Sequence, residues 1–218
     1  MANQEPPEIE ERPQSRREWS GWLRSLVLPL ALVVVIVGGL LYYESRRAPE
    51  ASDPRFGTLA LPAPLNATDE APAGNAGRAA PDFRLELLGG GELQLSDLQG
   101  SPVLVNFWAT WCTTCRIETP DLIETYERNK ERGLVVLSVN QREADAGVRR
   151  FVDEFGVTFP VVMDRRGEVA RTWQIGGPNQ GLPASYFIDS EGVIRKVIFG
   201  LLRAKDLEAG LALILEDG

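Results

Sequence analysis

Residues 103–115 read VLVNFWATWCTTC, and this stretch decides the fold of the 218-residue chain. Residues 103–108 are apolar except for Asn106, a run that is typical of a strand buried on both faces of a sheet. Cys112 and Cys115 follow shortly afterwards, where the pattern changes to that of a helix. The sequence therefore predicts two thiols at the start of a helix that directly follows a buried strand.

The residues around this stretch alternate between predicted strands and helices. A hairpin is indicated by alternating apolar and polar residues at 83–87 and 92–95, on either side of three glycines. Further strands are predicted at 134–139, 160–163, 185–189 and 193–199, and helices at 117–130, 147–155, 168–173 and 204–216. This order predicts an α/β fold with a sheet of mixed strand direction, flanked by helices, over residues 79–218.

An apolar segment lies near the N-terminus. Residues 25–43 are nineteen consecutive uncharged residues, which as a helix would reach roughly 28 Å, close to the hydrocarbon thickness of a bilayer. Trp19 and Trp22 precede the segment and Tyr42 and Tyr43 end it, as expected of aromatic rings at the two membrane interfaces. We expect a single transmembrane helix that stays as an anchor. The alternative is a cleaved signal peptide, for which the run is long and lacks a following Ala-x-Ala site.

The arginines on either side of this segment predict its orientation. Four precede it and two follow it: Arg12, Arg16, Arg17, Arg24, Arg46 and Arg47. This bias predicts a short cytoplasmic tail at residues 1–24 of a single-pass protein of the cytoplasmic membrane, with everything after the anchor on the periplasmic or extracellular side. Residues 44–78 are rich in Ala, Pro and Gly, which predicts a flexible linker.

The composition excludes several classes of function. The chain has no histidine, which removes a Ser-His-Asp triad, a Cys-His protease and a Cys2His2 zinc site. Two cysteines are too few for a four-thiolate zinc site or an iron–sulfur cluster, so we expect no metal, and a dithiol–disulfide exchange cycle would need no bound cofactor. A net charge of -8 argues against nucleic acid as a partner.

The spacing of the two cysteines predicts redox chemistry. The start of a helix stabilises a thiolate, so Cys112 is the predicted nucleophile, and Cys115, one turn along, would resolve a mixed disulfide formed on it. The alternatives are a structural disulfide or half of a zinc site. The first would constrain the unfolded chain little, and the second needs a pair of ligands that the chain lacks.

Two separated motifs, FWATWCTTC at 107–115 and GLPASYFID at 181–189, resemble those of membrane-anchored thiol-disulfide oxidoreductases of the TlpA, ResA and CcmG type. The resemblance covers residues 79–218 and implies a thioredoxin fold with an N-terminal β-hairpin extension. It also implies that Pro183 is a cis-proline facing the cysteine pair, and that Leu182 offers its peptide groups to a bound substrate strand. Trp111 would belong to the docking surface.

Glu118 is a further candidate for the site. It lies three residues after Cys115 and so on the same helix face, where a carboxylate would raise a thiol pKa and could accept or return the proton of Cys115. The resembling families often have a glutamate at this place, and a solvated surface glutamate is the alternative. Asn106 occupies the position at which cytosolic thioredoxins commonly carry a buried aspartate, and an asparagine cannot titrate.

The resemblance implies a reductant of disulfides in envelope proteins. Apocytochrome c during cytochrome maturation is one candidate substrate, and an integral-membrane thiol protein would supply the electrons. A thiol peroxidase of the same fold is an alternative, although Ala109 stands where the peroxiredoxin pattern has a hydroxyl residue. A second alternative is a non-catalytic binding module that holds a partner in the groove at Pro183.

Overall fold

The computed structural model describes residues 29–39, 55–177 and 181–215, and the chain divides into two units, Met1–Ser52 and Asp53–Gly218. In the first unit, residues 29–39 form a helix with exposed side chains. Within the ranges that the structure describes, no helix is both long and apolar enough to cross a membrane. The predicted tail, both ends of the predicted span and residues 44–54 lie outside the described residues.

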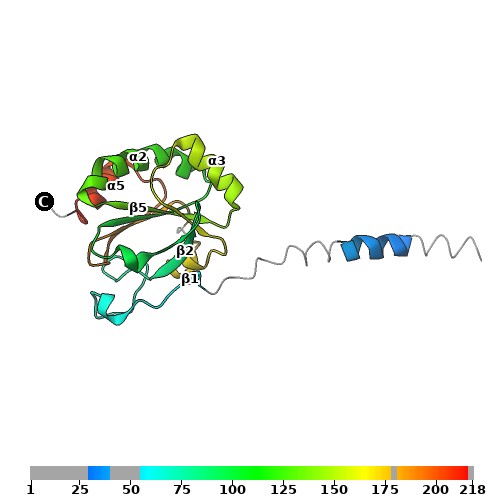
Figure 1. The fold of residues 1–218 in the computed structure, drawn as a ribbon, viewed down its shortest axis with the longest axis horizontal. Coiled ribbons are helices and arrows are strands. Elements are labelled where there is room, and N and C mark those ends of the chain that lie inside the picture. The colour runs from blue at the N-terminus through cyan, green and yellow to red at the C-terminus, as the bar shows by residue number, and fades with distance from the viewer. Residues whose placement is uncertain (1–28, 40–54, 178–180, 216–218) are drawn as a thin grey trace, which may run out of the picture. The chain divides into compact units, whose positions relative to one another are not determined.

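The second unit is built on one mixed sheet, and its described residues contribute eight strands (Figure 1). They are β1 (Gly57–Thr58), β2 (Phe83–Leu87), β3 (Glu92–Gln94), β4 (Val103–Trp108), β5 (Val135–Gln141), β6 (Val161–Asp164), β7 (Ala184–Ile188) and β8 (Ile194–Phe199). The order is β1-β2-β6-β5-β4-β7-β8, with β3 paired to β2. β4, β5 and β6 run parallel, whereas β2, β7 and β8 pair antiparallel with their neighbours. The prediction of a sheet of mixed strand direction is confirmed.

Helices cover this sheet on both faces. They are α2 (Thr113–Asn129), α3 (Asp145–Phe155), α4 (Glu168–Thr172) and α5 (Ala204–Leu211), of which α2, α3 and α5 lie together on one side (Figure 1). All six residues of β4 are buried. Val105 and Phe107 pack on one face in a cluster with Trp173 of the α4 end, and Leu104 packs on the other face with Leu122 of α2. The prediction of a strand buried on both faces is therefore confirmed.

The structure describes residues 55–78 of the segment predicted as a linker. We call residues 55–78 the N-terminal strap, because they are held to the domain by backbone hydrogen bonds. β1 pairs with β2, and the amide of Gly77 donates to the carbonyl of Ile194 at 2.7 Å. Composition gave no sign of this because scattered backbone bonds, rather than a periodic apolar face, hold the strap.

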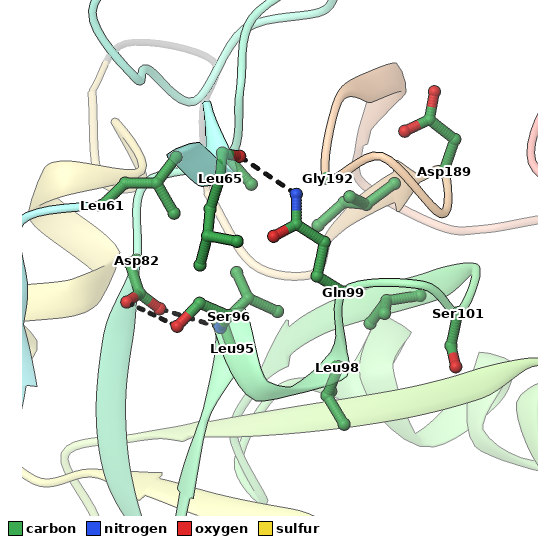
Figure 2. A pocket seen from close by; sticks show the side chains of 13 residues that line it. Leu61, Leu65, Asp82, Leu95, Ser96, Leu98, Gln99, Ser101, Asp189 and Gly192 are labelled. Atoms are coloured by element: carbon green, nitrogen blue, oxygen red, sulfur yellow. Dashed lines mark hydrogen bonds between the residues drawn. The ribbon is translucent and has the colours of Figure 1, made fainter. Parts of the chain in front are cut away.

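Side chains also fasten the strap (Figure 2). Leu61 and Leu65 help to line a cavity of about 30 Å³, room for one water molecule. Beside it, Nε2 of Gln99 donates to the carbonyl of Leu65 at 3.0 Å and to that of Glu191 at 2.9 Å. Gln99, in the loop after η2 (Leu95–Leu98), thus links the strap to the turn between β7 and β8.

Candidate active site

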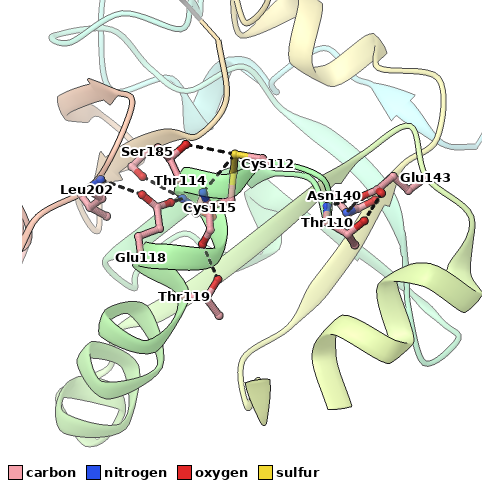
Figure 3. Close-up of a disulfide and its surroundings, with 11 residues drawn as sticks. Thr110, Cys112, Thr114, Cys115, Glu118, Thr119, Asn140, Glu143, Ser185 and Leu202 are labelled. Carbon is pink, nitrogen blue, oxygen red and sulfur yellow. Dashed lines mark hydrogen bonds between the residues drawn. A yellow bond between two sulfur atoms is a disulfide. The ribbon is translucent and has the colours of Figure 1, made fainter. Parts of the chain in front are cut away.

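The two cysteines lie at the start of α2, just after β4, and they form a disulfide (Figure 3). β4 ends at Trp108 and α2 begins at Thr113, so Cys112 is the residue that caps the helix and Cys115 lies in its first turn. The exposed fraction is 6% for Cys112 and 1% for Cys115. Cys112 is therefore the less buried of the two cysteines.

Few polar groups contact the sulfur of Cys112. Its Sγ accepts the backbone N–H of Cys115 at 3.2 Å, and the hydroxyl of Thr114 lies 3.4 Å away. In the ranges that the structure describes, no Lys or Arg side chain makes a hydrogen bond to either sulfur. A thiolate on Cys112 would thus be stabilised by the start of α2, with its free N–H groups and positive dipole end, and by one hydroxyl.

Glu118 is buried, with an exposed fraction of 1%, so the alternative of a solvated surface glutamate is wrong. Its Oε1 accepts from Nδ2 of Asn106 at 2.9 Å, and its Oε2 accepts from the backbone N–H of Leu202 at 2.8 Å. Nδ2 of Asn106 also donates to Oγ of Ser185 on β7, 3.0 Å away. Figure 3 shows the carboxylate reaching from α2 towards Leu202 and Ser185. The carboxylate of Glu118 on α2 is therefore bonded to β4 and to the loop before α5, and Asn106 links it to β7.

The surroundings of Glu118 change its acidity. Burial raises the pKa of the carboxyl from 4.5 to about 7, and its two hydrogen bonds, to the Leu202 amide and the Asn106 side chain, oppose the rise without cancelling it. Such a group exchanges protons near neutral pH, as an acid–base partner of a thiol must.

Leu182 and Pro183 directly precede β7. The peptide bond between them is cis, as the resemblance implies. Leu182 packs against the cluster that contains both cysteines. The carbonyl of Pro183 accepts the amide of Gly200 at 2.8 Å, whereas no hydrogen bond within the described residues uses the backbone groups of Leu182. These groups are therefore free to pair with an added strand.

Trp111 stands apart from the buried members of the site. Its side chain is 70% exposed, and that of Ile117, further along α2, is 58% exposed. Large apolar side chains that are so exposed beside a reactive pair provide a surface on which another protein can dock.

Sequence reasoning missed a second polar group at the site. Glu143, in the loop between β5 and α3, accepts the backbone N–H of Thr110 at 2.7 Å and Nδ2 of Asn140 at 2.8 Å, and its other oxygen accepts the Thr110 hydroxyl. No motif in the sequence pointed to this glutamate. Ser185 and the amide of Leu202 were missed for the same reason, because only the fold brings them to β4 and α2.

Comparison with known proteins shows the family to which the chain belongs. The sequence model of the AhpC/TSA family matches residues 76–197. The thiol-disulfide oxidoreductase ResA of Geobacillus kaustophilus is 39% identical over 135 residues, which cover 62% of this chain and 75% of that relative. The ResA of Oceanobacillus iheyensis is 38% identical over 150 residues, covering 67% and 76%. The chain belongs to the AhpC/TSA family, as a thiol-disulfide oxidoreductase of the ResA type.

Solved structures agree with this assignment. A thiol:disulfide interchange protein of the thioredoxin family from Chlorobium tepidum is 29% identical, with a TM-score of 0.57 over 68% of this chain and 99% of that one. A secreted thiol-disulfide isomerase from Corynebacterium glutamicum is 26% identical, with a TM-score of 0.56 over 63% and 83%. The thioredoxin-like mixed α/β fold of this oxidoreductase is confirmed.

The chemistry of the ResA-type oxidoreductase is therefore dithiol–disulfide exchange at Cys112 and Cys115. One thiolate attacks a disulfide sulfur, a mixed disulfide forms, and the second thiol resolves it. Within the described part of the chain, no cluster of three or more acidic or cysteine side chains is placed to hold a metal ion.

Proposed function

We propose that this oxidoreductase is a reductant of disulfides in cell-envelope proteins, with apocytochrome c among its substrates. The Cys112 thiolate attacks a substrate disulfide, and one substrate sulfur leaves as a thiolate that takes up a proton. Cys115 then loses its proton and attacks Sγ of Cys112. The second substrate sulfur leaves as a thiol, and the Cys112–Cys115 disulfide forms, so that two electrons pass to the substrate.

The surroundings of the Cys112 sulfur carry this proposal. A dithiol is a strong oxidant in its disulfide form when the fold strongly stabilises the thiolate, and a reductant when it does not. Here the sulfur has one amide and one hydroxyl as partners. Arg116, the nearest arginine along α2, instead pairs with Glu154 and lies over the rings of Phe151 and Phe155. An ionised Glu118 nearby would further disfavour a thiolate.

We place the catalytic domain outside the cytoplasm, held by an anchor at residues 25–43 with the N-terminus inside. The excess of arginines before that segment supports the orientation, and a similar protein from Corynebacterium glutamicum is described as secreted. An integral-membrane thiol protein is then the electron donor. A membrane-impermeant maleimide added to intact cells after mild reduction should label the cysteines, and labelling only after lysis would reject this topology.

The reduction potential of the full-length protein tests the direction of electron flow. Equilibrated against a glutathione series, the Cys112–Cys115 pair should lie nearer to the value of about -270 mV for thioredoxin than to about -120 mV for the oxidant DsbA. The reduced protein should also open the disulfide of an apocytochrome c. A potential near that of DsbA, with no reduction of apocytochrome c, would reject the proposal.

Two controls separate the remaining alternatives. A thiol peroxidase would consume peroxide at the rate of a dedicated enzyme. Here Ala109, in the turn before Cys112, has only a buried methyl group and no hydroxyl to orient peroxide. We therefore expect negligible peroxide turnover. A non-catalytic binding module would keep its cellular function in Cys112→Ser, and we expect that variant to lose it.

A further inference from the structure

Glu143 contacts the active site without contacting either sulfur. It is half-buried in the loop between β5 and α3, and both of its carboxylate oxygens are used by Thr110, one by the backbone N–H and the other by the hydroxyl. Figure 3 shows Glu143 pointing back from its own loop to Thr110 and Asn140. One side chain thus makes two hydrogen bonds to a residue that lies two positions before Cys112.

Thr110 belongs to the turn that presents the nucleophile. The N–H of Cys112 donates to the carbonyl of Ala109 at 3.1 Å, so Ala109 to Cys112 form a β-turn with Thr110 and Trp111 at its centre. The orientation of Thr110 therefore sets the direction in which Trp111 and Cys112 leave the sheet. Trp111 itself is mostly exposed and gives the turn little support of its own.

The sheet and the loop backbone hold Glu143 in place. Nδ2 of Asn140 donates to its carboxylate, and Asn140 is fully buried at the end of β5, in register with Trp108 of β4. The next loop residue, Arg142, has a left-handed backbone with a φ of 56°, and its amide donates to the carbonyl of Asp164. Moving Glu143 would break its bond to Asn140 of β5 and disturb the bond between Arg142 and Asp164 of β6. The carboxylate therefore holds the turn in one geometry.

We propose that Glu143 is a positioning residue for thiol-disulfide exchange. It fixes the Ala109–Cys112 turn so that the sulfur of Cys112 meets a polypeptide disulfide in line while Trp111 contacts the polypeptide. Exchange needs three sulfur atoms aligned, and loosening such an alignment lowers the rate without changing the acidity of the thiol. The inference rests on the exchange reaction alone, and it holds whether or not apocytochrome c is a substrate.

A purely electrostatic role of Glu143 predicts the opposite sign. A carboxylate near a thiolate raises the thiol pKa, so removing its charge would make Cys112 more acidic and more reactive at neutral pH. The positioning role instead predicts slower exchange after Glu143→Ala, which removes the charge and the hydrogen bonds together. The two explanations are therefore distinguished by the direction of the change.

The test uses the full-length reduced protein in detergent micelles and two probes. The first is a synthetic peptide with one internal Cys-x-x-Cys disulfide, and the second is iodoacetamide, which needs an accessible thiolate but no aligned disulfide. Glu143→Ala, which removes all three hydrogen bonds of the carboxylate, should lower kcat/KM for the peptide about tenfold, and Thr110→Val, which removes only the hydroxyl, about fivefold. Thr110→Ser should restore the wild-type value. Alkylation of Cys112 at high pH should stay within about twofold of wild type in every variant.

The pair Glu127 and Thr158 provides a matched control. The hydroxyl of Thr158 donates to the carboxylate of Glu127 near the far end of α2, so Glu127→Ala and Thr158→Val make the same chemical changes away from the site. Both should exchange at the wild-type rate. If Glu143→Ala does not fold, Thr110→Val and Thr110→Ser decide alone. Unchanged or faster peptide exchange in Thr110→Val or Glu143→Ala would overturn the proposal, as would an equal loss of alkylation and exchange.

In a double-variant cycle, the losses from Glu143→Ala and Thr110→Val should not multiply. The double variant should be no slower than Glu143→Ala alone, because the Thr110 hydroxyl supports the turn through its bond to Glu143. Losses that multiply fully would show that the two residues act independently, and would also overturn the proposal.

Discussion

Two opposing electrostatic effects meet at Glu118. Hydrogen bonds from the Asn106 side chain and the Leu202 amide favour the ionised carboxylate, whereas burial disfavours it. Burial is the larger effect, and the pKa of the carboxyl is raised to about 7. Because Glu118 lies one helical turn beyond Cys115, it is the group best placed to take the proton that Cys115 must lose when it resolves a mixed disulfide.

Glu118→Gln tests this proton transfer. In the wild type, the rate at which Cys115 resolves a mixed disulfide should rise as pH increases through about 7, the pKa of Glu118, because only the ionised carboxylate accepts a proton. The variant should lose that inflection while the later rise from ionisation of the thiol itself remains. Single-turnover release of a reduced peptide between pH 5 and 9 measures both, and identical profiles would reject the role of Glu118.

The same pKa makes a separate prediction about stability. The folded protein holds the Glu118 proton more tightly than the unfolded chain, so the corresponding stabilisation is complete below pH 4.5 and is lost as pH rises to about 7. Relative to Glu118→Gln, the wild type should lose about 3 kcal/mol of unfolding free energy across this window. Urea titrations of both proteins at pH 4.5 and 7.5 measure the difference, and parallel changes would contradict it.

Trp111 is exposed enough that its removal should cost almost no stability. We expect Trp111→Ala to change the free energy of unfolding by less than about 0.5 kcal/mol and to weaken reduction of polypeptide disulfides about tenfold, since only the docking surface is lost. Reduction of the small reagent hydroxyethyl disulfide should be unaffected. Equal losses with both substrates would show that Trp111 acts on the thiol and does not bind the polypeptide.

The sequence alone predicted those site residues that lie in a recognisable local motif. Cys112 and Cys115 were found from their spacing after a buried strand, and Pro183 from the resemblance of its motif. Glu118 could be placed on the correct helix face, but its burial could not be predicted, because the groups that surround it come from β4 and from the loop before α5. Glu143 has no local signal at all, and only the parallel pairing of β4 with β5 brings its loop to the turn.

Among the elements, α5 shows how closely a helix lies on the sheet. A Cβ at Gly210 would come within 2.2 Å of the ring of Phe187, which is fully buried on β7. Gly210→Ala should therefore destabilise the domain by about 1–3 kcal/mol through overpacking. Gly147 on α3 is the matched control, because a Cβ there meets nothing within 4 Å, and Gly147→Ala should be neutral or stabilising by about 0.5 kcal/mol. Equal effects of the two substitutions in urea unfolding would contradict this packing.

The predicted elements agree with the observed ones where their sequence pattern is strong. The residues of β4, β7 and α3 were placed to within about two positions of their bounds. The C-terminal helix was predicted over 204–216, whereas α5 ends at Leu211 and turns follow it. Apolar side chains at Ile214 and Leu215 continue the helical pattern because they pack in the same core cluster as Leu207. The apolar pattern of these buried residues therefore led to a predicted helix that runs past the observed end at Leu211.

At the scale of the whole molecule, the N-terminal strap changes how the domain connects to the preceding chain. Gly74 lies against the backbone of Trp173, where a Cβ would come within 2.8 Å of its carbonyl oxygen, and Asn75 accepts a hydrogen bond from Gln174. The strap therefore contacts the end of α4, from which the chain continues towards Pro183. Composition predicted a free linker at these residues, because close backbone contacts leave no trace in hydropathy.

Release of the strap should be visible by proteolysis. Gly74→Val should make residues 55–78 more than about tenfold more susceptible to limited digestion, since the strap has few buried apolar contacts with which to re-form its bonds. The disulfide exchange rate of the uncut variant should stay near that of the wild type. A protease pattern identical to that of the wild type would show that this glycine is not needed to hold the strap.

Trapping of the mixed disulfide tests the central claim, that Cys112 is the nucleophile and Cys115 resolves the intermediate. Full-length Cys115→Ser, reduced and mixed with oxidised apocytochrome c, should accumulate a covalent complex through Cys112 that thiol reductants release. Cys112→Ser, treated in the same way, should form none. A complex that forms equally in Cys112→Ser, or in neither variant, would contradict the account.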